Sequence, residues 1–266
     1  MDLGTSQRAR NVLTLDREGS SRARIVNFII TLLLLSGMKI LILNGSPNLD
    51  KGNTGRILAA LEKGLEIKKP EITTKYIYQL NIKPCQGCFT CWTKTLGKCI
   101  HRDDMDEILP ILAESDMLII GTPVYIDGMT GPMKTFIDRI IPAGKGSVEL
   151  RNDHLRHLLR DNWKKKKIVL VSPSSFTEMD NFHPLVTHVK GIARHLNCSY
   201  AGEILAPSFW LNEFNEEPYG KMLEIITSAG EELVKKGEIH LSETLQKFVS
   251  RDKLFEALNQ EFGKYE

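Results

Sequence analysis

Short runs of apolar residues recur along the chain, and each is followed by a loop of small or polar residues. Most of these runs contain branched side chains and few polar breaks, as expected for strands buried on both faces of a parallel sheet. The run at residues 72–79 differs, because its apolar and polar positions alternate. The pattern predicts five strands, at residues 39–43, 72–79, 117–120, 168–171 and 200–205.

Between these strands, apolar residues recur with the period of an amphipathic helix. Within residues 55–66 the period is carried by Ile57, Leu58, Leu61 and Leu65. Further helices are expected at residues 103–115, 130–141 and 184–195. Strands that alternate with helices indicate an α/β fold with a parallel sheet. We therefore predict a flavodoxin-like three-layer sandwich whose five-stranded parallel sheet has the order 2-1-3-4-5.

Two regions lie outside this alternation. Residues 143–166 are mostly polar and predict a connection that contains a short helix. Residues 221–235 and 242–262 are amphipathic and predict two terminal helices. We divide the chain into three parts. Residues 1–37 are an N-terminal extension, and residues 38–210 are a flavodoxin-like main domain with a cysteine-rich loop at 84–101. Residues 211–266 are a C-terminal helical extension.

The N-terminal segment has an unusual composition. Residues 1–24 are polar and arginine-rich, and residues 25–35 are apolar. This apolar run is shorter than the about 20 residues needed to span a bilayer, although its outline is that of a signal peptide. Met38 stands directly before the first predicted strand. We expect residues 1–37 to be a disordered extension or a mis-called start, with a weak membrane-associating arm as the alternative. We expect a cytoplasmic protein without stable membrane insertion.

The composition of the 266 residues is that of an ordinary globular protein, with 42% apolar and 26% charged residues. This length is sufficient for one large domain with a full core. The net charge of +2 and the aromatic content of 7% give no reason to expect a nucleic-acid partner.

The loop after the first strand has the features of a phosphate site. It offers hydroxyl and amide groups just before a helix, at Ser46, Asn48, Asn53 and Thr54. Backbone N–H groups and the helix dipole attract an anion at such a position. The loop lacks both Gly-Lys-Ser/Thr and G-x-G-x-x-G, so triphosphate and dinucleotide motifs are excluded. A terminal monophosphate such as that of FMN fits; a hydroxyl-rich turn with Thr54 near a helix N-cap is the alternative.

The loop after the third strand is expected at the same edge of the sheet, where parallel α/β folds bind ligands. It reads Thr122-Pro123-Val124-Tyr125 and suits the edge of an aromatic ring. Pro123 stiffens the turn, Tyr125 can stack, and backbone donors can reach flavin carbonyls. An ordinary half-buried tyrosine is the alternative for Tyr125. The loop after the fourth strand, residues 172–176, also supplies small residues at this edge.

Four of the five cysteines fall within residues 84–99, in a C-x2-C-x2-C-x7-C pattern formed by Cys85, Cys88, Cys91 and Cys99. Such spacing can surround an iron–sulfur cluster or a zinc ion, or form a disulfide. The compact triple favours the cluster, since zinc sites more often use two separated knuckles. The fifth cysteine, Cys198, is expected to be a small packed residue.

Taken in order, these motifs resemble those of a known family. The segments are Asn44-Gly45-Ser46-Pro47, Gly52-Asn53-Thr54, the four cysteines, Asp103-Asp104-Met105, Gly121-Thr122-Pro123-Val124-Tyr125 and Lys134-Thr135-Phe136-Ile137-Asp138-Arg139. The chain resembles the iron–sulfur flavoproteins, a branch of the NAD(P)H-dependent FMN reductase superfamily, over residues 38–210. The seven-residue gap before Cys99 is at the long end of that family's range.

The resemblance implies one FMN and one [4Fe-4S] cluster per subunit, in a homodimer or homotetramer. The FMN phosphate would be held by Ser46, Asn48, Asn53 and Thr54. The isoalloxazine would contact Thr122, Pro123, Val124, Tyr125, Ser172 and Ser174. The cluster would be bound by Cys85, Cys88, Cys91 and Cys99.

The expected activity is that of the cofactors, so no catalytic side chain is predicted. We expect an oxidoreductase that relays electrons between a one-electron carrier, such as a ferredoxin, and a two-electron acceptor, with NAD(P)H as a candidate donor. One alternative is an NAD(P)H-dependent FMN or quinone reductase of the same fold without a cluster. A second alternative is a non-enzymatic module that binds zinc and no flavin.

Overall fold

The computed structural model describes residues 37–214 and 216–265 of the chain. The predicted extension at residues 1–37 lies outside this part except for Gly37. Within the described residues, no helix combines the length and the apolar character that crossing a membrane requires.

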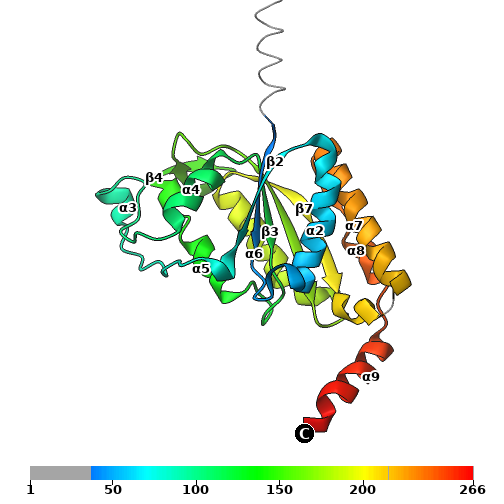
Figure 1. The fold of residues 1–266 in the computed structure, drawn as a ribbon. Helices are drawn as coiled ribbons and strands as arrows, with labels where there is room; N and C mark the ends of the chain where they lie inside the picture. Colours follow the sequence, from blue (N-terminus) through cyan, green and yellow to red (C-terminus); the bar gives the residue numbers. More distant parts are fainter. Residues whose placement is uncertain (1–36, 215, 266) are drawn as a thin grey trace, which may run out of the picture. The chain divides into compact units, whose positions relative to one another are not determined.

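A parallel sheet of order β2-β1-β3-β6-β7-β8 forms the centre of the fold (Figure 1). Its strands are β1 (Lys39–Asn44), β2 (Glu71–Tyr76), β3 (Met117–Gly121), β6 (Lys167–Ser174), β7 (Ser199–Pro207) and β8 (Ile239–His240). The first five reproduce the predicted order 2-1-3-4-5. The two-residue β8 adds a sixth strand, which pairs parallel with β7.

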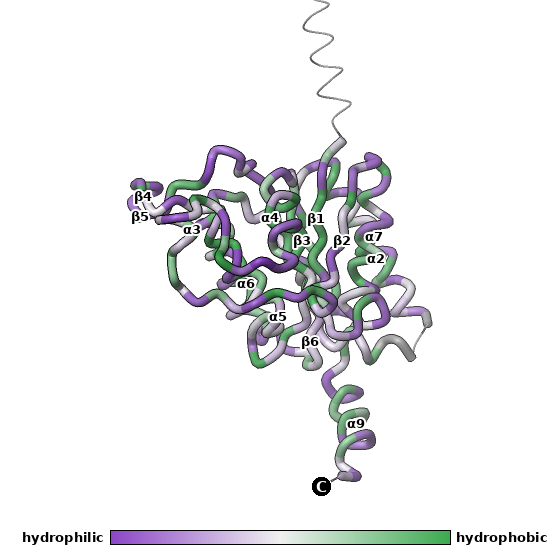
Figure 2. Tube along the Cα trace, turned by 60° about the vertical axis from the view of Figure 1, so that its left-hand side comes forward, coloured by the Kyte–Doolittle hydropathy of each residue, from purple (hydrophilic) through white to green (hydrophobic). Residues whose placement is uncertain are grey.

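Successive residues of β1 point to opposite faces of the sheet and enter two separate cores. Ile40 and Ile42 pack against α2 and α7, while Leu41 and Leu43 pack against α4, α5 and α6. Figure 1 shows these helices on the two sides of the sheet, and Figure 2 shows β1 and β3 as hydrophobic segments between them. The helices are α2 (Asn53–Leu65), α3 (Thr90–Thr93), α4 (Met105–Glu114), α5 (Gly131–Asp138), α6 (His183–His195), α7 (Glu216–Lys236), α8 (Ser242–Gln246) and α9 (Arg251–Phe262).

Short 3-10 turns connect several of these elements. They are η1 (Leu49–Lys51), η2 (Glu66–Lys68), η3 (Ile77–Gln79), η4 (Ile141–Ala143), η5 (Met179–Phe182), η6 (Phe209–Phe214) and η7 (Gly263–Tyr265). The second strand is therefore shorter than expected, because residues 77–79 form a turn. The single helix expected at residues 242–262 is instead two, α8 and α9, and the Ser250 hydroxyl caps the second by accepting from Lys253 N–H.

The helix α7 packs closely on α2. A Cβ at Gly230 would lie 2.3 Å from the Leu61 carbonyl oxygen, and one at Gly64 would lie 2.0 Å from the Thr227 carbonyl oxygen. Both positions therefore require glycine for this approach. Since Ile226 and Leu233 of α7 are buried in the same core as β1, residues beyond 211 contribute to the sandwich.

The helix predicted within residues 143–166 is wrong. The segment forms an antiparallel hairpin of β4 (Gly144–Arg151) and β5 (His154–Leu159). Its turn is Asn152-Asp153, and both residues have positive φ, of 50° and 59°. Two left-handed residues give the type I′ geometry that matches the twist of paired strands, and Asn and Asp tolerate it well. The Asn152-Asp153 pair is a turn signal in the sequence, but the charged residues on both sides of it are more typical of a solvated connection than of strands.

Candidate functional site

The loop between β1 and α2 is folded by its own polar groups. Ser46 N–H donates to Asn44 Oδ1 (3.0 Å), and Asn48 N–H donates to Ser46 Oγ (3.3 Å). The Asn44 amide in turn donates to the Leu49 carbonyl oxygen (3.2 Å). These bonds hold the loop against the first turn of α2, where free N–H groups gather.

Thr54 in that first turn is 1% exposed, and its Oγ1 is buried with no hydrogen-bond partner among the described residues. A buried polar atom without a partner is destabilising and calls for an explanation. An anion at the N-terminus of α2 would accept from this hydroxyl and from the free N–H groups. The loop therefore fits a phosphate group, and its contact with Ser46, Asn48 and Asn53 stays a prediction.

Hydrogen bonds join the other two candidate loops to this one. Thr130 Oγ1 donates to the Gly45 carbonyl oxygen (2.9 Å), and Thr130 N–H donates to Thr122 Oγ1 (3.2 Å). Ser172 Oγ donates to the Thr122 carbonyl oxygen (2.7 Å), and Val124 N–H donates to that of Pro173 (3.0 Å). The three loops thus meet at the carboxyl edge of the sheet, as predicted.

The six residues predicted around an aromatic ring differ in accessibility. Thr122 and Ser172 are fully buried, and their hydroxyls bond to other parts of the protein. Ser174 is 8% exposed and donates to the Phe176 carbonyl oxygen. Pro123, Val124 and Tyr125 reach the surface. Contact of these residues with a flavin stays a prediction, and the structure gives Thr122 and Ser172 a role in joining the loops.

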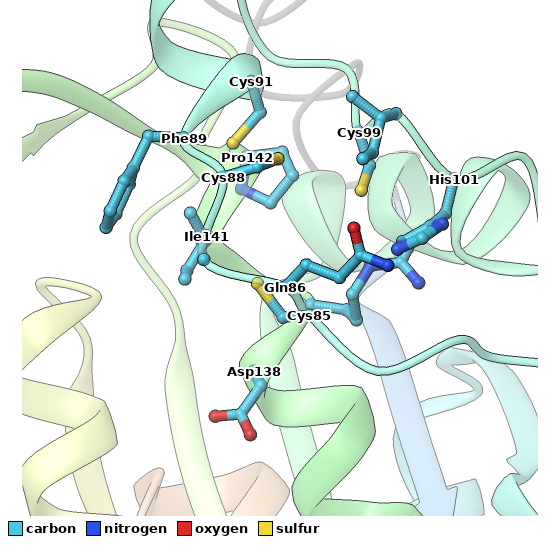
Figure 3. A pocket seen from close by; sticks show the side chains of 13 residues that line it. Cys85, Gln86, Cys88, Phe89, Cys91, Cys99, His101, Asp138, Ile141 and Pro142 are labelled. Atoms are coloured by element: carbon cyan, nitrogen blue, oxygen red, sulfur yellow. The ribbon is translucent and has the colours of Figure 1, made fainter.

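The four clustered cysteines line one pocket, together with His101 and Arg139. Figure 3 shows their sulfur atoms arranged around a common space. Among the residues described, no three His, Cys, Asp or Glu side chains stand in a metal-binding arrangement. The donor set nevertheless fits a thiolate-ligated group, because four thiols from one loop surround the same cavity. Cys198 lies outside this pocket.

The thiols differ in their ease of deprotonation. Burial, followed by repulsion from a thiolate at Cys99, raises the pKa of Cys91. Hydrogen bonds from the Thr90 side chain and backbone lower the pKa of the exposed Cys88. Since a thiolate is the form that binds a metal, Cys88 is the better prepared of the two ligands.

The matching family model describes NADPH-dependent FMN reductase and covers residues 38–179, more than half of the chain. The chain belongs to the NADPH-dependent FMN reductase family. The match includes all three loops at the sheet edge and the whole cysteine loop. In this member of the family, a cysteine pocket accompanies the loop between β1 and α2.

Several curated relatives are iron–sulfur flavoproteins. One from Archaeoglobus fulgidus is 43% identical over 107 residues, which are 40% of this chain and 47% of the relative. One from Methanocaldococcus jannaschii is 37% identical over 120 residues, 43% of this chain and 58% of the relative. The chain thus spans about half the length of the curated relatives it matches.

Solved structures share the fold at low sequence identity. The FMN-dependent NADH-azoreductase from Bacillus anthracis, in complex with FMN, gives a TM-score of 0.57 at 15% identity over 74% of this chain and 99% of that one. The NAD(P)H:quinone oxidoreductase from Methanothermobacter marburgensis gives 0.53 at 15% identity over 74% and 99%. These matches confirm the flavodoxin-like fold of this FMN reductase family member.

A buried ion pair closes the cysteine loop of this family member. Asp103 and Arg139 have side chains 0% and 1% exposed, and they form two hydrogen bonds, Nη1–Oδ2 at 2.6 Å and Nη2–Oδ1 at 3.0 Å. Arg139 also donates to the Lys83 carbonyl oxygen (2.6 Å), and Lys83 N–H donates to Asp103 (3.0 Å). The pair therefore ties the residue before the loop to the residue after it.

The hairpin β4–β5 supports the other side of the loop. Arg160, which follows β5, donates to the carbonyl oxygens of Pro142 (2.8 Å) and Cys91 (3.0 Å). Trp92 Nε1–H donates to the Ile141 carbonyl oxygen (3.0 Å), and its ring lies 4.3 Å from that of His157. Gly97 has φ of 94°, and a Cβ there would lie 2.7 Å from Arg160 Nε. A glycine is therefore required where the loop passes this arginine.

Sequence reasoning missed Arg139, Thr130 and Arg160 as parts of the site. Arg139 stands within the motif that carries the family resemblance, but nothing local shows that its partner is Asp103. Asp103 was assigned only to the start of a helix. The structure places it before α4, where Met105 N–H donates to its Oδ1 (3.2 Å) and Arg139 occupies its remaining lone pairs.

We predict that Asp103→Asn destabilises the protein by about 3 kcal/mol, since it leaves the buried Arg139 guanidinium without its anion. Denaturant unfolding at pH 7 measures this loss. The control is Asp106→Asn, which removes only the exposed pair with Arg102 and is expected to change stability by less than about 0.5 kcal/mol. Equal effects of the two substitutions would contradict the structural importance of the buried pair.

The same pair predicts a pH dependence. Burial alone would raise the pKa of Asp103, but hydrogen bonds from Arg139 and from Lys83 N–H outweigh it, so the pKa is lowered. The unfolded chain then binds more protons than the folded one below pH ~4, and stability falls as the pH falls through the lowered pKa. In unfolding experiments at several pH values, the stability difference between the unaltered protein and Asp103→Asn should be constant above pH ~5 and shrink below pH ~4. A difference independent of pH would show that the pKa of Asp103 is the same in the folded and unfolded states.

Proposed function

We propose that this chain is a flavin-dependent oxidoreductase that holds FMN at the sheet edge and a [4Fe-4S] cluster in the cysteine pocket. It relays electrons between a one-electron carrier and a two-electron acceptor. The observation that carries the proposal is the presence of four thiols around one cavity in a member of the NADPH-dependent FMN reductase family. The names of the iron–sulfur flavoproteins among its relatives support the same function.

The FMN phosphate would be bound at the N-terminus of α2. Thr54 and Ser46 offer hydroxyls there, Asn48 and Asn53 offer amides, and the backbone N–H groups of the first turn carry the partial positive charge of the helix. The proposed ring contacts are with Pro123, Val124 and Tyr125, which are accessible at the same edge. Thr122 and Ser172 would position this loop through their hydrogen bonds.

The cluster would be bound by Cys85, Cys88, Cys91 and Cys99. When bound, FMN supplies one- or two-electron chemistry and the cluster supplies one-electron transfer. The chain's own contribution is to orient the thiols and to offset their negative charge. Arg139 lies in the same pocket and provides a cation that remains charged at all relevant pH values.

A second function deserves consideration because the described thiols do not already form a metal-binding arrangement. An NAD(P)H-dependent FMN or quinone reductase without a cluster would use the phosphate loop alone and leave the thiols free. A zinc-binding module without flavin is a third candidate, but it leaves the unpartnered Thr54 hydroxyl unexplained.

The proposed assembly is a homodimer or homotetramer, and the proposed one-electron partner is a ferredoxin-like carrier. Both proposals extend from the resemblance to iron–sulfur flavoproteins. NADH or NADPH is the proposed hydride donor, in keeping with the family to which the chain belongs.

We predict that Thr54→Val weakens FMN binding about tenfold, because a buried hydrogen bond to a charged group is lost while side-chain volume is kept. The affinity is measured by titrating the apoprotein with FMN and recording the quenching of FMN fluorescence on binding. Thr227→Val is the control, since its hydroxyl donates to the Ala60 carbonyl oxygen between α2 and α7. Unchanged affinity in Thr54→Val would remove this hydroxyl from the phosphate site.

We predict about four iron and four sulfide per chain in anaerobically reconstituted protein, and a large loss of both in Cys88→Ala. Cys88 is chosen because it is exposed, so its truncation opens no core cavity. Cys198→Ala should retain full iron content. Protein with FMN but no iron would favour the reductase without a cluster, and stoichiometric zinc without FMN would favour the binding module.

A further inference from the structure

Two side chains that line the cysteine pocket each have a buried nitrogen without a hydrogen-bond partner in the part of the chain described. They are Arg139, at Nε, and His101, at Nε2. A buried polar nitrogen without a partner costs free energy, and native structures contain few of them. Arg139 Nε always carries a proton, and His101 Nε2 is a donor in the tautomer that is protonated there. Their occurrence at one pocket, which four thiols also line, indicates an acceptor that belongs there.

Arg139 is held so that its Nε–H is the group left over. Its Nη1 donates to Asp103 and to the Lys83 carbonyl oxygen, and its Nη2 donates to the other Asp103 oxygen. The side chain is 1% exposed, so bulk solvent does not reach this group. Arg139 also interacts electrostatically with a thiolate at Cys99, so it offers the pocket both a positive charge and a directed N–H donor.

His101 approaches from the opposite end of the loop, two residues after Cys99. Figure 3 shows its ring on the Cys99 side of the space between the sulfur atoms. Its Nε2 is buried even though the side chain as a whole is only half-buried. The two nitrogens therefore come from different parts of the chain. Arg139 follows the last residue of α5, and His101 is the last residue of the cysteine loop.

We propose that the N–H groups of Arg139 and His101 donate hydrogen bonds to sulfur at this site and thereby set its reduction potential. This inference rests on the proposed function, because the acceptors are the sulfur atoms of a bound iron–sulfur cluster. Reduction adds one electron from the one-electron carrier and makes these sulfurs more negative. Donors that keep their protons stabilise the reduced state more than the oxidised state, and the potential rises.

The test is an anaerobic redox titration of the reconstituted full chain, with dithionite as reductant and electron paramagnetic resonance as readout. His101→Phe removes the donor and keeps the ring volume, and Arg139→Lys removes Nε–H and keeps a cation beside Asp103. Each is expected to lower the equilibrium constant for reduction about tenfold, which is about 59 mV for one electron. His101→Gln retains an N–H donor and should restore part of the shift.

Matched controls separate this effect from general changes near the loop. His154→Phe alters an exposed histidine of β5 outside the pocket, and Arg102→Lys alters an exposed arginine paired with Asp106. Both should leave the reduction equilibrium within about twofold of the unaltered protein. Should Arg139→Lys fail to fold, His101→Phe and His101→Gln decide the question.

The outcomes distinguish this inference from the function on which it rests. Protein that takes up no iron would overturn the cluster itself. Iron-loaded His101→Phe and Arg139→Lys with unchanged potentials would overturn only the role of the two donors. A shift of equal size in the two control variants would also overturn it, because the effect would then not depend on a directed hydrogen bond.

Discussion

The buried pair between Arg139 and Asp103 is the interaction on which the cysteine loop depends. Between β2 and α4 the chain contains only the 3-10 turn η3 and the one-turn helix α3, so the hydrogen bonds of regular structure hold little of it. The pair fixes both ends of this segment, through Lys83 on one side and the start of α4 on the other. A buried ion pair offsets its desolvation cost only when its hydrogen bonds are well formed, and here they also connect separate chain segments. Its main contribution is therefore a defined loop geometry.

The helix α5 links the two candidate cofactor positions. Thr130 precedes its first residue and bonds to both the phosphate loop and the loop at Thr122. Arg139 follows its last residue and lines the cysteine pocket. The helix has eight residues and thus a length of about 12 Å. A short, rigid element with one candidate site at each end fixes their separation within a subunit, which is what a relay between two redox groups requires.

Local sequence patterns were sufficient for the sheet, its order and the three loops at its carboxyl edge, because each depends on periodicity or on residues close in sequence. The hairpin β4–β5 was missed because its signal is the Asn152-Asp153 turn, whereas its strands carry charges that resemble a solvated connection. The roles of Arg139 and Arg160 could not be found in this way. Their partners, Asp103 and the Cys91 carbonyl oxygen, lie 36 and 69 residues away. Ser172 was predicted at the flavin from its place in the sequence, and its hydrogen bond between two loops was not.

The hairpin gives a physical reason why the cysteine loop has this form. Arg160 uses its donors on the carbonyl oxygens of Pro142 and Cys91, and Trp92 uses its donor on that of Ile141. These contacts hold the loop by its backbone and do not use the cysteine side chains. The only buried side-chain nitrogens without partners among the described residues are those of Arg139 and His101, and both line the thiol pocket. The protein thus satisfies its backbone at this loop from outside and directs its unused donors inward, an arrangement suited to a sulfur-rich anion and poorly suited to an empty surface depression.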